Sequence, residues 1–169
     1  WLGTVASTRA YRTSASVSRR LMTPFLVASV LGGIAGAAWL IRTEERTFVT
    51  VLPWLLLFAT LLFAFGGRLT KRLARAFDGE PSARAIILAT AFEFLAAIYG
   101  GYFGGGLGII SLAMFSLLGM TDIHAMNRLK VILGSVINGV ATAVFVFSGA
   151  ISWPEARIML VGAMIGGYG

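Results

Sequence analysis

No cysteine occurs among the 169 residues, the only histidine is His124, and 12% of the residues are charged. Without cysteine there is neither a disulfide nor a thiolate metal site, and one imidazole cannot hold zinc by itself. We therefore predict no metal and no cofactor. The low charge also argues against a water-soluble fold, because a soluble chain of this size could not bury the 57% of its residues that are hydrophobic.

The apolar residues are instead gathered in blocks of about 18 to 25, separated by short charged stretches, which is the pattern of bilayer-spanning helices. The mean hydropathy of +0.85 agrees with this pattern. The sequence therefore predicts an all-α, polytopic helical membrane protein, for which the lipid bilayer is the partner along most of the chain.

Two basic linkers indicate the orientation of the spans. Linker 9–20 carries four arginines and no acid, and linker 66–84 carries five basic residues against two acids. Basic loops stay on the cytoplasmic side, so both linkers are expected there, in a multi-pass protein of the cell (inner or plasma) membrane. An anionic inner leaflet, and not a nucleic acid, accounts for the net charge of +7. The spans at about 21–41 and 48–65 lie between the linkers and are joined by an external loop at 42–47.

A turn signal, Asp-Gly-Glu-Pro-Ser at 78–82, divides the chain. We assign 1–78 to the end of a first half, which begins with the end of a helix at 1–8, and 79–169 to a second half. Both termini are expected to be truncated, because the sequence begins without Met and stops inside an apolar run. The second half is expected to hold a helix pair and two spans, at about 85–119, 122–147 and 153–169.

The apolar stretch 85–119 is too long for one span and has six glycines between Gly100 and Gly108. Glycine costs about 1 kcal/mol relative to alanine inside a helix, so we expect the backbone to unwind there. Unwound backbone at membrane depth must be buried in protein or line a cavity. A helix that resumes near Leu107 would offer an anion its first N–H groups and its positive dipole end. A tight helix crossing is the alternative; the candidate binding residues are Gly104, Gly105 and Gly106.

The next predicted span carries a polar stripe. Spacings of 3, 4, 4 and 4 residues put its members on one face of a helix. Such a face should look into the protein or a wet cavity, although its lysine could also reach back to the inner membrane surface. The stripe consists of Asn127, Lys130, Gly134, Asn138 and Thr142, of which Asn127, Lys130 and Asn138 are candidate substrate-binding residues.

Glu93 is the only acid within 85–119. An ionised carboxylate at the centre of a bilayer costs about 3 kcal/mol or more. Three interpretations stay open: Glu93 couples transport to protons, it pairs with Lys130 or an arginine, or it is solvated in a shallow re-entrant segment. His124, at a predicted helix start, is interpreted as an ordinary surface residue.

Several motifs occur in a characteristic order: the glycine run at 100–108, Leu118-Gly119, Ala-Met-Asn-Arg-Leu-Lys at 125–130, and Gly-Ala-Ile-Ser-Trp at 149–153. Together they resemble the second-half signature of the sulfite exporter TauE/SafE family. The order of basic linker, glycine-broken hairpin and polar-faced span also fits, so the resemblance covers most of the chain.

The resemblance implies two inverted repeats, each a hairpin followed by three spans, of which the first hairpin and the last span are missing here. It also implies a re-entrant hairpin that returns to the cytoplasmic side. The function implied is export of small anions, sulfite or organosulfonates, by alternating access, and not an enzymatic reaction. A homo-oligomer is compatible with this architecture.

Two other functional classes stay open. A membrane-embedded enzyme would need a nucleophile and a base, but Ser111, Ser116 and Ser135 have only His124 as a distant partner. A membrane scaffold would use the glycines for close packing and bind no substrate. A second glycine-broken hairpin of opposite orientation, in the missing first half, would favour transport over a scaffold.

Overall fold

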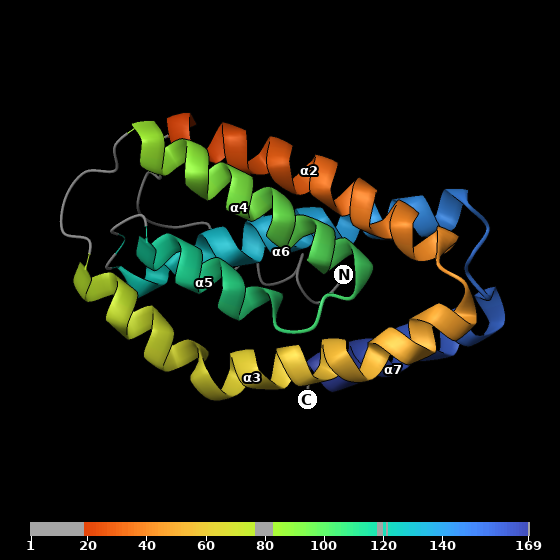
Figure 1. Ribbon diagram of the computed structural model, residues 1–169. Coiled ribbons are helices and arrows are strands. Elements are labelled where there is room, and N and C mark those ends of the chain that lie inside the picture. The colour runs from red at the N-terminus through yellow and green to blue at the C-terminus, as the bar shows by residue number, and fades with distance from the viewer. Residues whose placement is uncertain (1–18, 77–82, 118–119, 121, 169) are drawn as a thin grey trace.

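The computed structural model describes residues 19–76, 83–117, 120 and 122–168, and the described chain is helical without any strand (Figure 1). The predicted all-α class is therefore confirmed. The interpretation of 1–8 as the end of a helix falls outside the described residues. The helices are α2 (Arg19–Arg42), α3 (Glu45–Ala76), α4 (Ala83–Tyr102), α5 (Leu107–Leu117), α6 (Ile123–Phe147) and α7 (Trp153–Tyr168).

The helix bounds follow the apolar blocks, with one departure. Helix α2 from Met22 to Arg42 and all of α6 are long and apolar enough to cross a membrane. Helix α3, in contrast, continues to Ala76, so residues 66–76 of the second basic linker are helical rather than a loop. The reason is composition, because the leucines, alanines, arginines and lysine of this stretch are strong helix formers. The expected external loop is reduced to Thr43 and Glu44.

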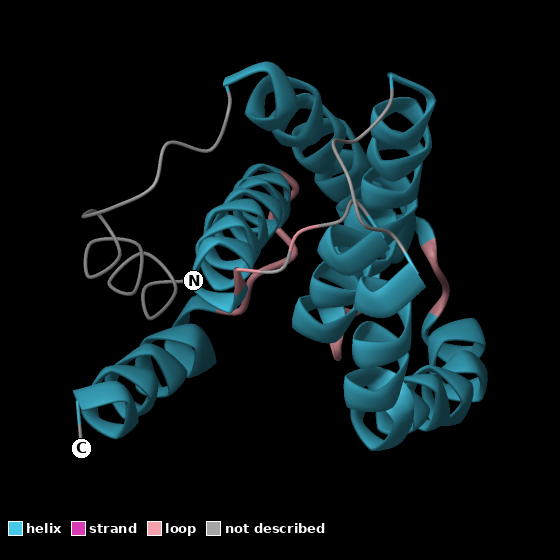
Figure 2. Cartoon of the chain, turned by 90° about the vertical axis from the view of Figure 1, so that its left-hand side faces the viewer, coloured by secondary structure: helices cyan, strands magenta, loops and turns pink. Residues whose placement is uncertain are grey.

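Helices α2, α4 and α6 run in the same direction and pack against one another (Figure 1). Helix α5 runs back beside them, in contact with α3, α4 and α6. The chain thus leaves one end of the bundle in α4, turns, and returns toward that end in α5, so that α4 and α6 begin at the same end. Helix α7, which leads to the C label in Figure 2, lies at the edge of the molecule and packs against no other described helix.

The closest approach in the bundle is that of α2 to α4, where glycines face backbone atoms. A Cβ added to Gly32 would lie 2.6 Å from the carbonyl oxygen of Phe94, and one added to Gly101 would lie 2.5 Å from the carbonyl oxygen of Gly33. A Cβ on Gly36 would meet the carbonyl oxygen of Ile98. Small residues let two helix backbones approach closely in a membrane, where packing has to replace the hydrophobic effect.

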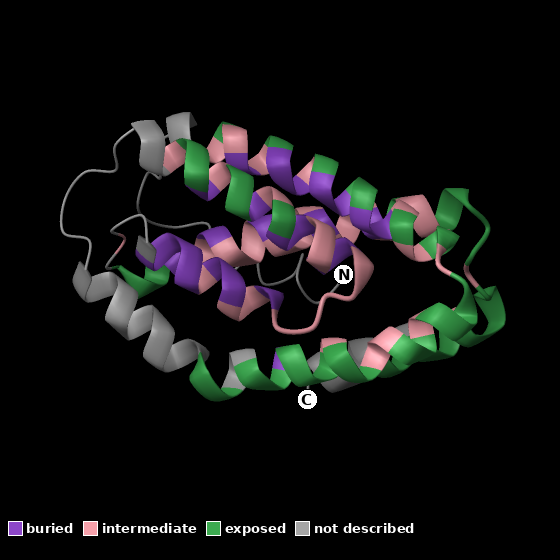
Figure 3. Cartoon of the chain, in the orientation of Figure 1, coloured by how far each residue is buried: buried purple, intermediate pink, exposed green. Residues whose placement is uncertain are grey.

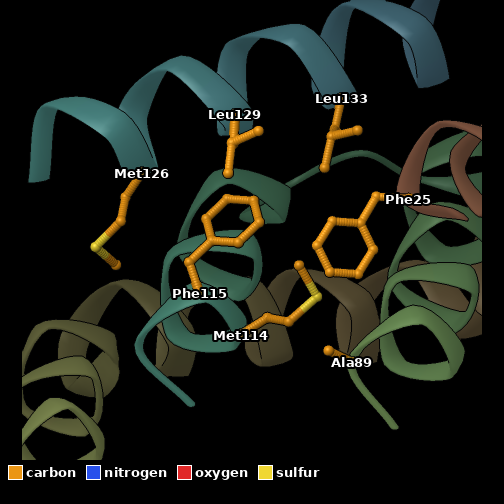
Figure 4. Packing of buried hydrophobic residues seen from close by; sticks show 7 residues of the cluster. All are labelled: Phe25, Ala89, Met114, Phe115, Met126, Leu129 and Leu133. Carbon is orange, nitrogen blue, oxygen red and sulfur yellow. The ribbon is translucent and has the colours of Figure 1, made fainter. Parts of the chain in front are cut away.

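Side chains from α2, α4, α5 and α6 fill the interior next to this contact. Figure 4 shows the largest cluster, in which the rings of Phe25 and Phe115 lie with their centroids 6.4 Å apart. A second cluster packs Leu107, the first residue of α5, against α4 and α6. Its buried members are Ala96, Ala97, Leu107, Ile110 and Ile137.

Burial is concentrated in these four helices, whereas the described side chains of α3 and α7 are largely exposed (Figure 3). Many of their exposed side chains are large and apolar: Trp54 on α3 is 70% exposed and Ile158 on α7 is 76% exposed. Large apolar side chains on the outside of a helical bundle are expected where lipid is the solvent. Both helices therefore have the surface of membrane-embedded elements.

The glycine contact predicts a difference between two Gly→Ala substitutions. Gly36→Ala should lower the stability of the full-length protein by about 1–3 kcal/mol, because its methyl group collides with backbone that cannot rotate away. Gly162→Ala in α7, where an added Cβ meets nothing within 4 Å, should be neutral or slightly stabilising. Thermal unfolding in detergent measures both. Equal melting temperatures for the two variants would contradict this account of the contact.

Candidate functional site

The helix pair predicted from the glycine run is present, and it is broken between α4 and α5. The four residues 103–106 are not helical, and Gly104 (φ 80°) and Gly106 (φ 78°) adopt the left-handed conformation that glycine tolerates without steric cost. Helix resumes at Leu107, as expected. The alternative of an unbroken tight crossing is therefore wrong for this segment, although glycines 100 and 101 at the end of α4 do serve close packing.

The break leaves backbone donors without acceptors. The N–H groups of Phe103 and Gly104 both donate to the carbonyl oxygen of Tyr99, at 2.8 and 3.2 Å. In contrast, the N–H groups of Gly105, Gly106 and Gly108 donate to no backbone oxygen in the described part of the chain. Because they lie at the N-terminus of α5, the positive end of its dipole adds to their partial charges.

Tyr99 holds the shape of the break. Its hydroxyl donates to the carbonyl oxygen of Gly105 at 2.6 Å, and its ring contacts Phe58 of α3 and Phe103, with centroids 5.5 and 5.9 Å away. In a trans peptide the carbonyl and the following N–H point in opposite directions. Since the Gly105 carbonyl points to Tyr99, the N–H of Gly106 points away from it, out of the aromatic cluster.

Lys130 of α6 reaches the start of α5. The Cδ atom of Lys130 lies 3.2 Å from the place where a Cβ on Gly108 would stand, so its aliphatic chain crosses the second residue of α5. Helix α6 is anchored nearby by its N-cap Asp122, whose carboxylate accepts the N–H of His124 at 2.9 Å. The structure thus brings together the glycine break and the lysine, two features 22 or more residues apart in sequence.

The remaining residues of the polar stripe are half-buried along the same edge of α6. Gly134, between Lys130 and Asn138, borders open space, since an added Cβ would meet nothing within 4 Å. Asn127 and Asn138 form no hydrogen bond with residues 103–106 in the described chain, and His124 is exposed. Of the three candidate residues on α6, Lys130 contacts the residues that follow the break, whereas Asn127 and Asn138 form no hydrogen bond with it in the described chain.

Glu93 is fully buried between α4 and α2. Its Oε1 accepts a hydrogen bond from the Ser29 hydroxyl at 2.7 Å, and its Oε2 has no partner among the described residues. The interpretation of Glu93 as solvated is wrong, and so is its pairing with Lys130. The reason is the close α2–α4 contact, which excludes water from this level of the bundle and presents a hydroxyl to the carboxyl group.

The serines considered for catalysis are engaged with their own helices. Ser111, Ser116 and Ser135 each donate to the carbonyl oxygen four residues earlier, at 2.7–3.1 Å. This is the usual bond of a hydroxyl in an apolar helix, and it uses the proton that a base would have to remove. Within the described ranges, no three His, Asp or Glu side chains gather as metal ligands.

Sequence reasoning missed Tyr99 and Ser29. Both are hydroxyl residues in apolar helices, where the hydroxyl has to find a partner. From the sequence, one can therefore expect each hydroxyl to form a hydrogen bond. It does not identify the partner, because the Gly105 carbonyl becomes available only through the break, and Glu93 lies 64 residues from Ser29.

These features define an all-helical membrane protein with a central hairpin broken by glycine, at which a lysine meets a helix N-terminus. The model of the family described as Sulfite exporter TauE/SafE matches residues 1–169. The chain belongs to this family of membrane transporters. No curated protein and no solved structure matches it.

The hydroxyl of Tyr99 should control the order of the break. In Tyr99→Phe the ring contacts remain but the Gly105 carbonyl is released, and loss of about 1 kcal/mol should speed amide exchange at Phe103 and Gly104 about fivefold. Tyr102→Phe is the matched control, since its hydroxyl makes only a 3.4 Å contact with Thr43 outside the break. Hydrogen exchange by mass spectrometry on 100–108 measures the effect; equal exchange in both variants would show that the hydroxyl has no such role.

Proposed function

We propose that this chain is part of a transporter that exports small anions of the sulfite or organosulfonate class. The observation that supports it most is the meeting of unpaired N–H groups at the start of α5 with the chain of Lys130 over Gly108. Helix N-termini with uncommitted N–H groups bind anions in many proteins, and broken helices supply such ends at membrane depth in transporters.

The chemistry of the donors fits this substrate class. Sulfite and sulfonate groups each present three oxygens that accept hydrogen bonds, and the N–H groups of Gly105, Gly106 and Gly108 are three donors within four consecutive residues. The ammonium of Lys130 adds the positive charge that balances the anion. Helices α5 and α6 carry no acid, so nothing on them favours a cation.

In this proposal the remaining candidate residues complete the site. Gly104 and Gly106 supply the backbone conformation that exposes the donors. Asn127 and Asn138 contribute amide groups along the polar edge of α6, next to the open space at Gly134. The anion passes between the hairpin and this edge.

The proposed transport cycle is alternating access in the cell membrane. The ranges 1–78 and 79–169 belong to two inverted repeats, and the first repeat supplies the other half of the binding site. The basic residues of 9–20 and 66–84 face the cytoplasm. The α4–α5 hairpin opens toward that side, which is the side from which an exporter takes its substrate.

Lys130→Ala should impair transport more than folding. Loss of a charge-assisted hydrogen bond of about 1.5–3 kcal/mol should raise the KM for anion about tenfold to a hundredfold. Vesicles with the full-length protein and radiolabelled sulfite or simple sulfonates provide the measurement. Arg46→Ala, which removes an exposed cation at the start of α3, should keep the wild-type KM. If the wild type transports no small anion, the proposed function is refuted and a scaffold becomes the better explanation.

Gly104→Ala tests whether the conformation of the break matters for the anion. Alanine in the left-handed region costs about 1–2 kcal/mol, and Gly149→Ala in the α6–α7 loop imposes the same strain at φ 70°, away from the proposed site. Both variants should lose similar stability in thermal unfolding. Only Gly104→Ala should raise the KM. A similar KM for both would mean that the break binds no substrate.

A further inference from the structure

The proposed anion site makes no use of Glu93, the one fully buried acid of the described chain. Its carboxyl group lies at the α2–α4 contact with one oxygen on the Ser29 hydroxyl and the other, Oε2, without a hydrogen-bond partner. A partnerless oxygen at a fully buried position requires an explanation, because nearly all buried polar atoms are paired. A proton on Oε2 removes the charge that makes this position costly.

No cation of the described residues is hydrogen-bonded to Glu93. The other titratable side chains of α2 and α4 belong to residues near the helix ends, apart from Tyr99, whose hydroxyl donates to the carbonyl oxygen of Gly105. Helix α5 has no charged residue, and the charged groups of α6 lie in its first two turns. Ser29 is the one hydrogen-bond partner of the carboxyl group among the described residues. The other titratable residues of these helices are Arg19, Arg20 and Arg42 on α2, Arg84, Tyr99 and Tyr102 on α4, and His124, Arg128 and Lys130 on α6.

We propose that Glu93 is a proton-binding site, and that the transporter moves one proton together with the anion. This rests on the proposed anion transport. The proton comes from water, forms an O–H bond at Oε2, and returns to water on the other side of the membrane, so that nothing is oxidised or reduced. Because Ser29 and Glu93 belong to different helices, separation of α2 from α4 breaks their hydrogen bond and opens the carboxyl group to water.

Movement of proton and anion in the same direction follows from the repulsion between an ionised Glu93 and the bound anion. Glu93 and the end of α4 at Tyr102 are nine residues apart (102 − 93), or about 14 Å at 1.5 Å per residue. At that distance and an effective dielectric constant of about 20, an ionised Glu93 weakens anion binding by roughly tenfold. Linkage is reciprocal, so bound anion favours protonated Glu93 to the same extent. Proton and anion therefore bind together, which gives symport rather than exchange.

The test uses methanesulfonate, which stays ionised across the range of about pH 5 to 9 and so brings no titration of its own. The full-length protein is reconstituted in vesicles, and methanesulfonate transport is measured against pH together with a pH-sensitive dye inside the vesicles. The wild type should show about a tenfold rise in KM from the acidic to the alkaline end, and each anion should be accompanied by a proton. Glu93→Gln, which mimics the neutral carboxyl group, should keep the acidic-side KM at every pH and move no protons.

Glu44→Gln, at an exposed carboxylate in the α2–α3 turn, is the matched control and should keep the wild-type pH profile. A Glu93→Gln variant with an unchanged pH profile would overturn the proposal. If that variant does not assemble, the wild type provides the test by itself. Methanesulfonate transport by the wild type without proton movement would also overturn the proposal. Absence of methanesulfonate and sulfite transport by the wild type is a different result, which refutes the proposed function itself.

Discussion

Two helix backbones in van der Waals contact, α2 and α4, set the geometry of everything else in this bundle. The contact exists because glycines 32, 36 and 101 have no Cβ to keep the backbones apart. It brings Ser29 to the carboxyl group of Glu93, and at its far end it places the ring of Tyr102 5.7 Å from that of Trp39. Contacts with α2 therefore hold the end of α4 in place, and with it the break that follows.

The break has to meet two opposing requirements, one from the membrane and one from the proposed anion. A membrane requires backbone groups to be satisfied within the protein, yet an anion site requires uncommitted donors. The carbonyl of Gly105 is satisfied by Tyr99, and the N–H groups of Phe103 and Gly104 by a carbonyl of α4. The N–H groups of Gly105, Gly106 and Gly108 remain without a backbone acceptor among the described residues, and the last carbonyl oxygens of α4 remain without a backbone donor there. The unpaired N–H groups lie at the positive end of the α5 dipole, which favours an anion on that side of the break.

Charge inside the bundle is handled in two different ways. Lys130 is half-buried, so its aliphatic chain covers Gly108 while its ammonium can stay near water or an anion. Glu93 is fully buried and has only a hydroxyl beside it. A long flexible cation at an edge and a short acid in a sealed contact have different tasks in a transporter of the proposed kind: the first meets the substrate and the second responds to protons.

The sequence by itself determined the membrane class, the ranges of α2 and α6, and the break before Leu107, because hydropathy and the helix cost of glycine act locally. The motifs at 100–108 and 125–130 also indicated the family. Only the tertiary structure decided that Lys130 crosses the start of α5, that Tyr99 binds the Gly105 carbonyl, and that Glu93 is buried against Ser29. These contacts depend on how closely helices distant in sequence approach, and that distance is set by small residues whose partners no local pattern identifies.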